Sequence, residues 1–278
     1  MVPRGLGAQF REHAGRMSRP KDERLAWAEA KLREYEKVAL KFFRGPLKIE
    51  LKADQSPVTI ADRTIEERLR RDLSRAFPRD VVLGEEFGKP RNLGDSFWTI
   101  DPIDGTRAFS KGLPSWGMLL SYVERGVPVM GACRYPMFDT FLGTGTGVPA
   151  YERVAGRIAR LPKARPVRLA RAALFHGGCK WFLRTVHAKG FKRVVQSCYL
   201  ERAYGDCFAY LWVLRGKADA VLDCGVKIWD IAPFAALARA TGRVLTDFSG
   251  RSTITGPQAI LAHPALNREI VQLFHSAA

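Results

Sequence analysis

Residues 98–106 read Trp-Thr-Ile-Asp-Pro-Ile-Asp-Gly-Thr, and this segment constrains the fold of the chain more than any other. The apolar start predicts a strand, and Pro102 and Gly105 favour a turn directly after it. Such a turn can aim the Asp101 and Asp104 carboxylates and the Ile103 carbonyl at one point. Crowded carboxylates repel one another strongly unless a cation lies between them. The segment therefore predicts an all-oxygen site for a hard cation, and Mg²⁺ is the usual ion where a phosphate shares such a site.

Further residues near this turn and at other turns fit the same site. Gly105 has no side chain, so backbone N–H groups at Gly105 and Thr106 can face an anion. Glu85 follows Gly84 at the end of a second apolar strand, and Asp230 follows a tryptophan at the start of a predicted helix. Each acidic residue alone could be an ordinary solvated carboxylate, and Asp230 could simply cap its helix. Together they favour a metal site.

Hydrophobic periodicity predicts a mixture of helices and strands. The helices are expected at 22–44, 61–77, 204–215, 229–241 and 264–275. The strands are expected at 81–83, 97–100, 117–123, 127–134, near 174, and at 193–195, 218–222, 244–247 and 259–262. This mixture predicts an α/β chain, with an α+β N-terminal part and an α/β C-terminal part.

Three regions are expected along the chain. Residues 1–20 lack periodicity and are expected to form a flexible arm. Residues 21–147 would form the α+β subdomain that carries most of the metal ligands. Residues 148–278 would form the α/β subdomain that carries Asp230 and the substrate pocket. The glycine-rich run 143–147 is the expected seam between them.

The chain is strongly basic, with 45 Lys and Arg against 28 Asp and Glu among 278 residues, a net charge of +17. The excess is concentrated in two stretches, 1–52 and 151–193, whereas 53–150 is nearly balanced. A basic protein that binds nucleic acid is therefore a distant alternative. Charge runs are usually solvated faces, and we expect no nucleic-acid partner.

The cysteines and the hydropathy indicate a cellular location. Five cysteines without a Cys-x-x-Cys pair favour reduced thiols in the cytoplasm. No segment approaches the roughly 20 apolar residues that span a bilayer, and no secretory pattern begins the chain. We expect no membrane partner.

The motifs together resemble the inositol monophosphatase family of Mg²⁺-dependent phosphatases. The matching pieces are Gly84-Glu-Glu, residues 98–106 and Trp229-Asp-Ile-Ala, in the family's order and approximate spacing. The resemblance covers roughly residues 22–275. It implies a layered α/β/α/β/α sandwich, two or three Mg²⁺ ions between the two parts, and a homodimer.

The resemblance also implies a role for individual residues. Glu85, Asp101 and the Ile103 carbonyl would hold a first metal ion. A second ion would be held by Asp101, Asp104 and Asp230. Thr106, oriented by Asp62, would accept a hydrogen bond from the attacking water or relay its proton, with Glu85 as the competing base. Lys52 resembles a lysine near the metals. Substrate contacts are implied for Asp104, Gly105, Thr106, Asp206 and Asp223.

Finer features resemble the histidinol-phosphatase branch, which implies hydrolysis of histidinol phosphate. They are the segments 52–62, 104–117, 204–210 and 227–232, of which 52–62 also resembles the 3′-phosphoadenosine bisphosphate nucleotidases. Asp206 and Asp223 could pair with the amine or imidazole of histidinol phosphate, but they could equally accept hydrogen bonds from inositol hydroxyls. Inositol 1-phosphate or another sugar or nucleotide phosphate is therefore the alternative substrate. The chain departs from the family at Thr241-Gly-Arg243, where Ala-Gly-Gly is usual, and at Pro233-Phe234, where small residues are usual.

Overall fold

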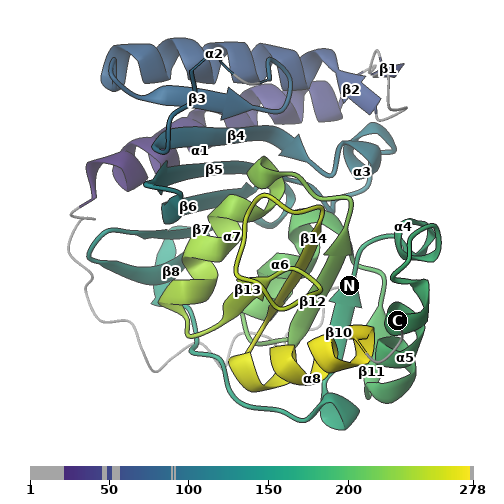
Figure 1. The fold of residues 1–278 in the computed structure, drawn as a ribbon. Helices are drawn as coiled ribbons and strands as arrows, with labels where there is room; N and C mark the ends of the chain where they lie inside the picture. The colour runs from purple at the N-terminus through teal and green to yellow at the C-terminus, as the bar shows by residue number, and fades with distance from the viewer. Residues whose placement is uncertain (1–21, 46–48, 52–56, 89, 91, 276–278) are drawn as a thin grey trace.

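The computed structural model describes residues 22–45, 49–51, 57–88, 90 and 92–275, and its larger sheet has seven strands (Figure 1). Its strands follow the chain in order, and only β3 and β4 pair in parallel. They are β3 (Val81–Gly84), β4 (Phe97–Asp104), β5 (Gly117–Glu124), β6 (Val127–Tyr135), β7 (Thr140–Gly145), β8 (Val148–Val154) and β9 (Arg157–Arg160).

A second sheet has five strands in the order β11-β10-β12-β14-β13. Strand β10 pairs in parallel with both of its neighbours, and β14 pairs antiparallel with β12 and β13. The strands are β10 (Ala173–His176), β11 (Leu200–Arg202), β12 (Ala220–Cys224), β13 (Val244–Thr246) and β14 (Gln258–Ala262). A separate hairpin joins β1 (Ile49–Leu51) to β2 (Pro57–Thr59).

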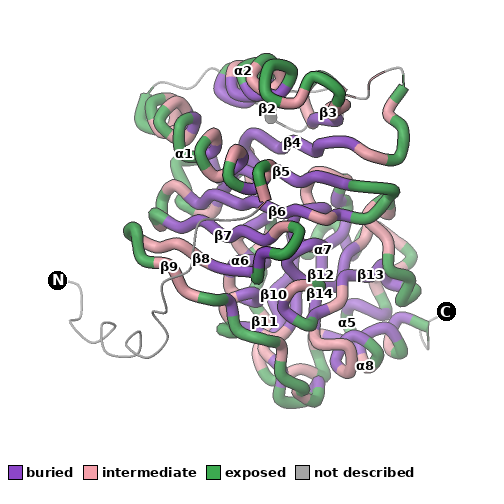
Figure 2. Tube along the Cα trace, turned by 90° about the vertical axis from the view of Figure 1, so that its left-hand side faces the viewer, coloured by how far each residue is buried: buried purple, intermediate pink, exposed green. Residues whose placement is uncertain are grey.

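The helices cover both sheets in layers. They are α1 (Glu23–Phe43), α2 (Ile60–Ala76), α3 (Thr106–Ser110), α4 (Cys179–Leu183), α5 (Ala188–Ser197), α6 (Asp206–Leu214), α7 (Ile228–Ala240) and α8 (Pro264–His275), with 3-10 turns η1 (Pro136–Phe138) and η2 (Leu169–Arg171). Helices α1 and α2 pack on the larger sheet, α7 contacts both sheets, and α8 packs on β14 and α5. The result is the expected α/β/α/β/α sandwich, in which the strands are mostly buried (Figure 2).

The first helix shows how the sequence pattern sets these layers. Asp22 caps α1, since its carboxylate accepts a hydrogen bond from the main-chain N–H of Leu25 (3.1 Å). Leu25, Ala28 and Leu32 are fully buried on its inner face, at spacings of three and four residues. This periodicity is why the helix expected at 22–44 is confirmed.

Two sequence expectations were wrong. Residues 193–195 were expected as a strand, but they belong to α5. In α5 the buried side chains of Phe191 and Val194 are three positions apart, so one face of the helix is apolar. A segment as short as 193–195 does not show this helical spacing, and its apolar residues therefore indicated a strand. Residues 143–147 were expected as a seam, but they lie in β7 and its tight turn into β8, within the larger sheet.

The division into two parts remains a proposal, and the topology argues for a different boundary from 147. The larger sheet continues through β9 to Arg160, and the first strand of the smaller sheet begins at Ala173. We therefore propose the boundary between these strands. The arm expected at 1–20 lies outside the described residues. Among the described helices, none is both long and apolar enough to cross a membrane.

Candidate active site

An irregularity in β4 brings two carboxylates of one strand together. In a regular strand, side chains three positions apart point to opposite faces. The pairing of β4 with β5 shifts register between Asp101 and Asp104, where Pro102 lies. Such an irregularity re-aims side chains. Asp101 also accepts a hydrogen bond from the main-chain N–H of Ile103 (3.1 Å), which closes the turn on itself.

Gly105 and Thr106 complete this turn. Gly105 has a φ of 86°, in the left-handed region, and a Cβ there would lie 2.9 Å from the Ser115 carbonyl oxygen. Glycine is therefore required on both conformational and steric grounds. The Thr106 hydroxyl donates to the Ile103 carbonyl (2.9 Å). Asp104 accepts a hydrogen bond from the main-chain N–H of Cys207, which ties β4 to the start of α6.

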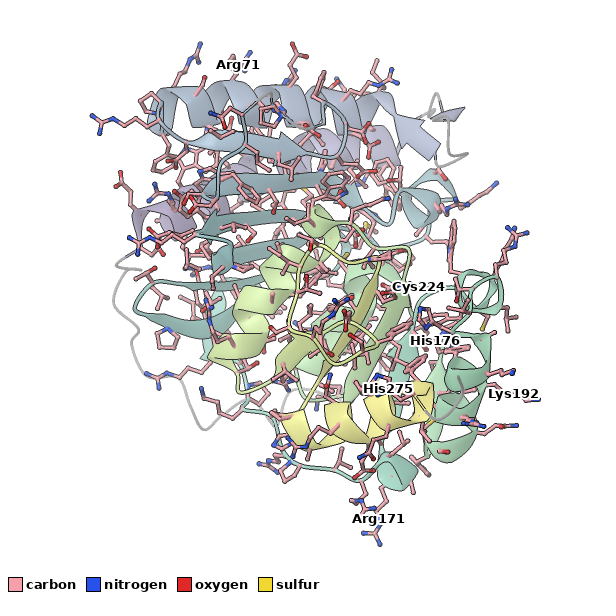
Figure 3. All side chains as sticks on the ribbon, viewed as in Figure 1. Arg71, Arg171, His176, Lys192, Cys224 and His275 are labelled. Atoms are coloured by element: carbon pink, nitrogen blue, oxygen red, sulfur yellow. The ribbon has the colours of Figure 1, made fainter. Side chains whose placement is uncertain are left out.

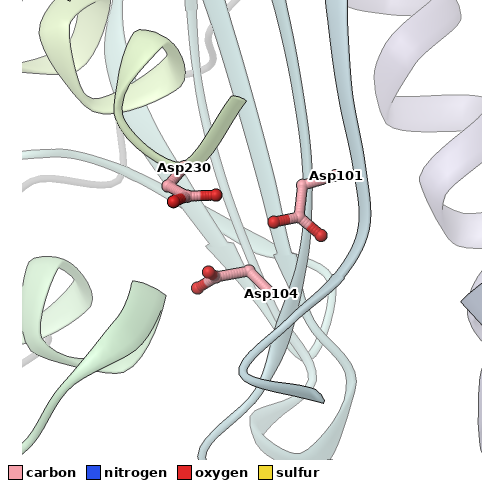
Figure 4. Close-up of side chains that lie close together, drawn as sticks. All are labelled: Asp101, Asp104 and Asp230. Carbon is pink, nitrogen blue, oxygen red and sulfur yellow. The ribbon is translucent and has the colours of Figure 1, made fainter. Parts of the chain in front are cut away.

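The third carboxylate comes from the start of α7. Asp230 lies in its first turn and accepts a hydrogen bond from the main-chain N–H of Lys227 (2.7 Å), so it caps the helix as well. One carboxylate oxygen from each of Asp101, Asp104 and Asp230 lies within 4.8 Å of the other two. The three side chains point toward one another (Figure 4).

The electrostatics of this cluster test whether it suits a cation. Burial raises the pKa of Asp101 well above its ordinary value, and the charges of Glu85 and Asp104 add to the effect. Burial likewise raises the pKa of Asp104, and the charges of Asp206 and Asp230 raise it further. Burial raises the pKa of Asp230 to about 8. Buried carboxylates that disfavour one another's ionised form are relieved by a shared cation. The donor set therefore fits Mg²⁺, which prefers oxygen ligands.

The turn that follows Glu85 is anchored by a residue that the sequence motifs did not indicate. Glu66 of α2 is fully buried and accepts hydrogen bonds from the main-chain N–H of Glu86 (2.8 Å) and from Arg70 (2.8 Å). A Cβ on Gly84 would lie 2.0 Å from the Glu66 carboxylate, so this close approach requires glycine. The spacing of Glu66 and Arg70 along the predicted helix was the available signal.

The cluster opens into a cavity of about 510 Å³ between the two sheets. Glu85, Asp104 and Asp230 form its acidic wall on the side of the carboxylate cluster. Asp206 and Asp223 line the same cavity from the start of α6 and the end of β12. The sequence motifs thus converge on one space, although they lie far apart in the chain.

Asp206 and Asp223 are carboxylates in an already acidic cavity. Burial raises the pKa of both carboxyl groups. The charge of Asp206 raises the pKa of Asp223 further. Asp206 has a φ of 54°, unusual for a residue with a side chain. Strained backbone of this kind is concentrated at functional sites. A Cβ on Gly177 would lie 2.3 Å from Asp223, so the chain passes directly beside that carboxylate.

The mouth of the cavity carries residues that the sequence did not single out for it. Trp181 on α4 lines the cavity and keeps 48% of its surface exposed. The Arg107 guanidinium lies 5.9 Å from the centre of its ring. Cys224, at the end of β12, lies beside α4 (Figure 3). The sequence could not assign Trp181 to the cavity, because a lone tryptophan carries no signal for one.

Not every implied role is visible. Asp62 is fully buried in the first turn of α2, and its charge helps to raise the pKa of Asp101, which places it near the cluster. Its pairing with Thr106 stays a prediction, as does metal binding by the Ile103 carbonyl. Lys52 lies outside the described residues.

The layered fold and the buried carboxylate cluster fit a phosphoric monoester hydrolase that uses a divalent cation. The model of the inositol monophosphatase family matches residues 21–278, and the chain belongs to this family. This match confirms the resemblance seen in the motifs. The members of the family are Mg²⁺-dependent phosphoric monoester hydrolases.

Individual relatives agree with this assignment. A histidinol-phosphatase from Mycobacterium tuberculosis is 33% identical over 226 residues, which cover 81% of this chain and 87% of that protein. A histidinol-phosphatase from Streptomyces coelicolor is 30% identical over 237 residues, covering 81% and 86%. Among solved structures, an inositol monophosphatase from Zymomonas mobilis superposes with a TM-score of 0.79 at 28% identity, covering 91% of this chain and 97% of that one.

Proposed function

We propose that the protein hydrolyses histidinol phosphate with the help of Mg²⁺. The observation that carries the proposal is that Asp206 and Asp223 share one cavity with the metal cluster. A phosphate ester held at the cluster would extend its alcohol part toward these two carboxylates. A leaving group with a cationic nitrogen complements them, because buried carboxylates are stabilised by a paired charge. The two histidinol-phosphatase relatives support the same substrate.

We propose that Asp101, Asp104 and Asp230 hold the metal, with Glu85 and the Ile103 carbonyl completing the ligands. Bound Mg²⁺ supplies water activation and neutralises charge on the leaving oxygen. The chain's own residues supply position. The Thr106 hydroxyl directs its proton to the Ile103 carbonyl (2.9 Å), so its oxygen remains an acceptor for the attacking water. Glu85 would be the alternative base.

The main-chain N–H groups of Gly105 and Thr106 would hold a phosphate oxygen during the displacement. Asp104 would contact both the metal and the substrate, since it lies in the cluster and lines the cavity. Its hydrogen bond from Cys207 fixes the carboxylate between β4 and α6. This placement would fix the position of the leaving group relative to the metal.

A substrate comparison tests the proposal. We would measure kcat/KM with Mg²⁺ for histidinol phosphate, inositol 1-phosphate, fructose 1,6-bisphosphate and 3′-phosphoadenosine 5′-phosphate. We expect histidinol phosphate to be preferred by at least about tenfold, about 1.4 kcal/mol of transition-state discrimination. A smaller preference would exclude histidinol phosphate as the specific substrate, and a preference for inositol 1-phosphate would favour the alternative.

We also propose that the protein is a homodimer. Leu183 at the end of α4 is 63% exposed, and Val186 just after it is 92% exposed. Exposed apolar side chains close together mark interaction surfaces. Light scattering after size-exclusion chromatography would test the mass, and a monomer at micromolar concentration would contradict the proposal.

A further inference from the structure

A second cavity, of about 300 Å³, lies away from the carboxylates and shares no lining residue with the active-site cavity. It is bounded by the loop after β9, the end of α6 and the turn between α7 and β13. Most of its charged lining residues are basic, and one carboxylate lies among them. These residues are Lys163, Arg165, Arg215, Asp219, Arg243 and His263.

Arg243 carries a buried charge in the wall of this cavity. Its guanidinium donates to the main-chain carbonyls of Pro162 (3.0 Å) and Val213 (2.8 Å). No carboxylate among the described residues lies within 4.0 Å of it. Burial lowers the pKa of Arg243 to about 10, and the charge of Asp219 opposes the shift. A cation bonded only to neutral acceptors lacks the paired charge that burial normally demands.

The other charges around the cavity do not remove this excess. Arg215 is paired with Glu152 (2.7 Å), so its charge is balanced. The Lys163 ammonium donates to the Ala240 carbonyl (2.8 Å), which is neutral. The His263 Nδ1 accepts from the main-chain N–H of Ala265 (3.1 Å), which leaves the Nε2 proton available for donation.

Arg243 is one of the two residues at which Thr241-Gly-Arg243 departs from the usual Ala-Gly-Gly of the family. The turn that carries it is tied to the opposite wall, because the main-chain N–H of Ala164 donates to the Thr241 carbonyl (2.8 Å). The departure therefore builds one wall of the cavity. The cavity lies at the far end of α7 from Asp230, and the helix from Asp230 to Ala240 spans roughly 15 Å.

We infer that this cavity binds a small anion with a phosphoryl group, placed between Arg243 at its buried side and Arg165 and Lys163 at its exposed rim. Guanidinium groups match the geometry of phosphate oxygens and bind them through paired hydrogen bonds. The volume of the cavity, about 300 Å³, is that of a site for a small ligand. The inference does not depend on the identity of the substrate at the active site.

The test uses inorganic phosphate as the probe and thermal unfolding of the full chain as the readout. EDTA keeps metal from the carboxylate cluster, which then repels phosphate, and chloride is exchanged for phosphate at constant ionic strength. We expect a saturable rise in Tm for the wild type. The variant Arg165→Glu should weaken the apparent affinity at least tenfold, since Arg165 is exposed and its replacement leaves the packing intact.

Arg160→Glu is the matched control. Arg160 is exposed on β9 outside the cavity, and its replacement changes the net charge by the same amount. This variant should keep the wild-type affinity. The inference would be overturned if the wild type showed no saturable rise, or if both variants lost affinity equally. It would also be overturned if a short single-stranded DNA bound at lower concentration than phosphate and both variants weakened it equally, because that result indicates a general basic surface.

Discussion

The carboxylate of Asp104, at the end of β4, accepts a hydrogen bond from the main-chain N–H of Cys207, at the start of α6. This contact joins the strand that supplies two residues of the carboxylate cluster to the helix that begins with Asp206. The carboxylate cluster and the part of the cavity lined by Asp206 are therefore fixed to each other. Changes at this junction should affect the binding of metal and substrate together.

Mg²⁺ should stabilise the fold, because the cluster holds three carboxylates close together. At a concentration 100 times its Kd, Mg²⁺ should add about 2.7 kcal/mol to the free energy of unfolding. The variant Asp101→Asn should lose most of this gain, and in EDTA it should be more stable than the wild type because one buried charge is removed. Thermal unfolding with Mg²⁺ and with EDTA measures both effects. An equal Mg²⁺ response in the two proteins would contradict the placement of the site.

Substitution of Gly105 should impair the protein more than substitution of Gly112, another glycine nearby. Gly105→Ala places a Cβ 2.9 Å from the Ser115 carbonyl at a φ of 86°, whereas Gly112→Ala meets nothing within 4 Å at a φ of 71°. Both should lose about 1–2 kcal/mol through the left-handed backbone. Only Gly105→Ala should also lower kcat/KM, by about 100-fold, since it displaces Asp104 and Thr106. Denaturant unfolding and steady-state kinetics measure the two effects, and equal kinetics would refute this role.

Trp181 should contribute to substrate binding through its exposed ring at the cavity mouth. Trp181→Ala should raise KM for histidinol phosphate about tenfold, because an aromatic face near a cationic ring contributes about 1–2 kcal/mol when desolvated. Leu183→Ala, on the same helix but outside the cavity, is the control and should change KM less than twofold. Loss of affinity in both variants would instead indicate a general role of α4.

These residues show what the sequence could and could not predict. Asp101, Asp104 and Asp230 were predicted as one site because each lies at a recognisable strand end, turn or helix start. The register shift in β4 was not predictable, since it depends on pairing with β5. The cavity wall around Trp181 and the support from Glu66 depend on contacts between segments that are distant in the chain. Local patterns carry no information about such contacts.

The stability of the α1–α2 layer should depend on pH through Asp72. Burial raises the pKa of Asp72, but hydrogen bonds from Lys31 (2.7 Å) and Tyr35 (2.7 Å) outweigh it and lower the pKa below 3.8. Because the folded pKa is the lower one, this stabilisation is present above about pH 4 and is lost as the pH falls through the folded pKa.

The variant Asp72→Asn tests this dependence. It should cost about 1.5–3 kcal/mol at pH 7, the usual range for hydrogen bonds to a charged group. The difference from the wild type should stay constant from pH 7 to 5 and shrink below pH 4. Urea unfolding across this range measures it. A difference that grows as the pH falls would contradict the sign of the shift.

Phosphate release from histidinol phosphate by the wild type and by Asp230→Asn, each with Mg²⁺ and with EDTA, tests the central claim most directly. The asparagine keeps the size of the side chain and an acceptor for the Lys227 N–H, so α7 retains its cap. We predict Mg²⁺-dependent release by the wild type, and a loss of at least about 100-fold in kcat for the variant, since it removes a metal ligand. Full activity of the variant with Mg²⁺, or wild-type activity that persists in EDTA, would contradict the account.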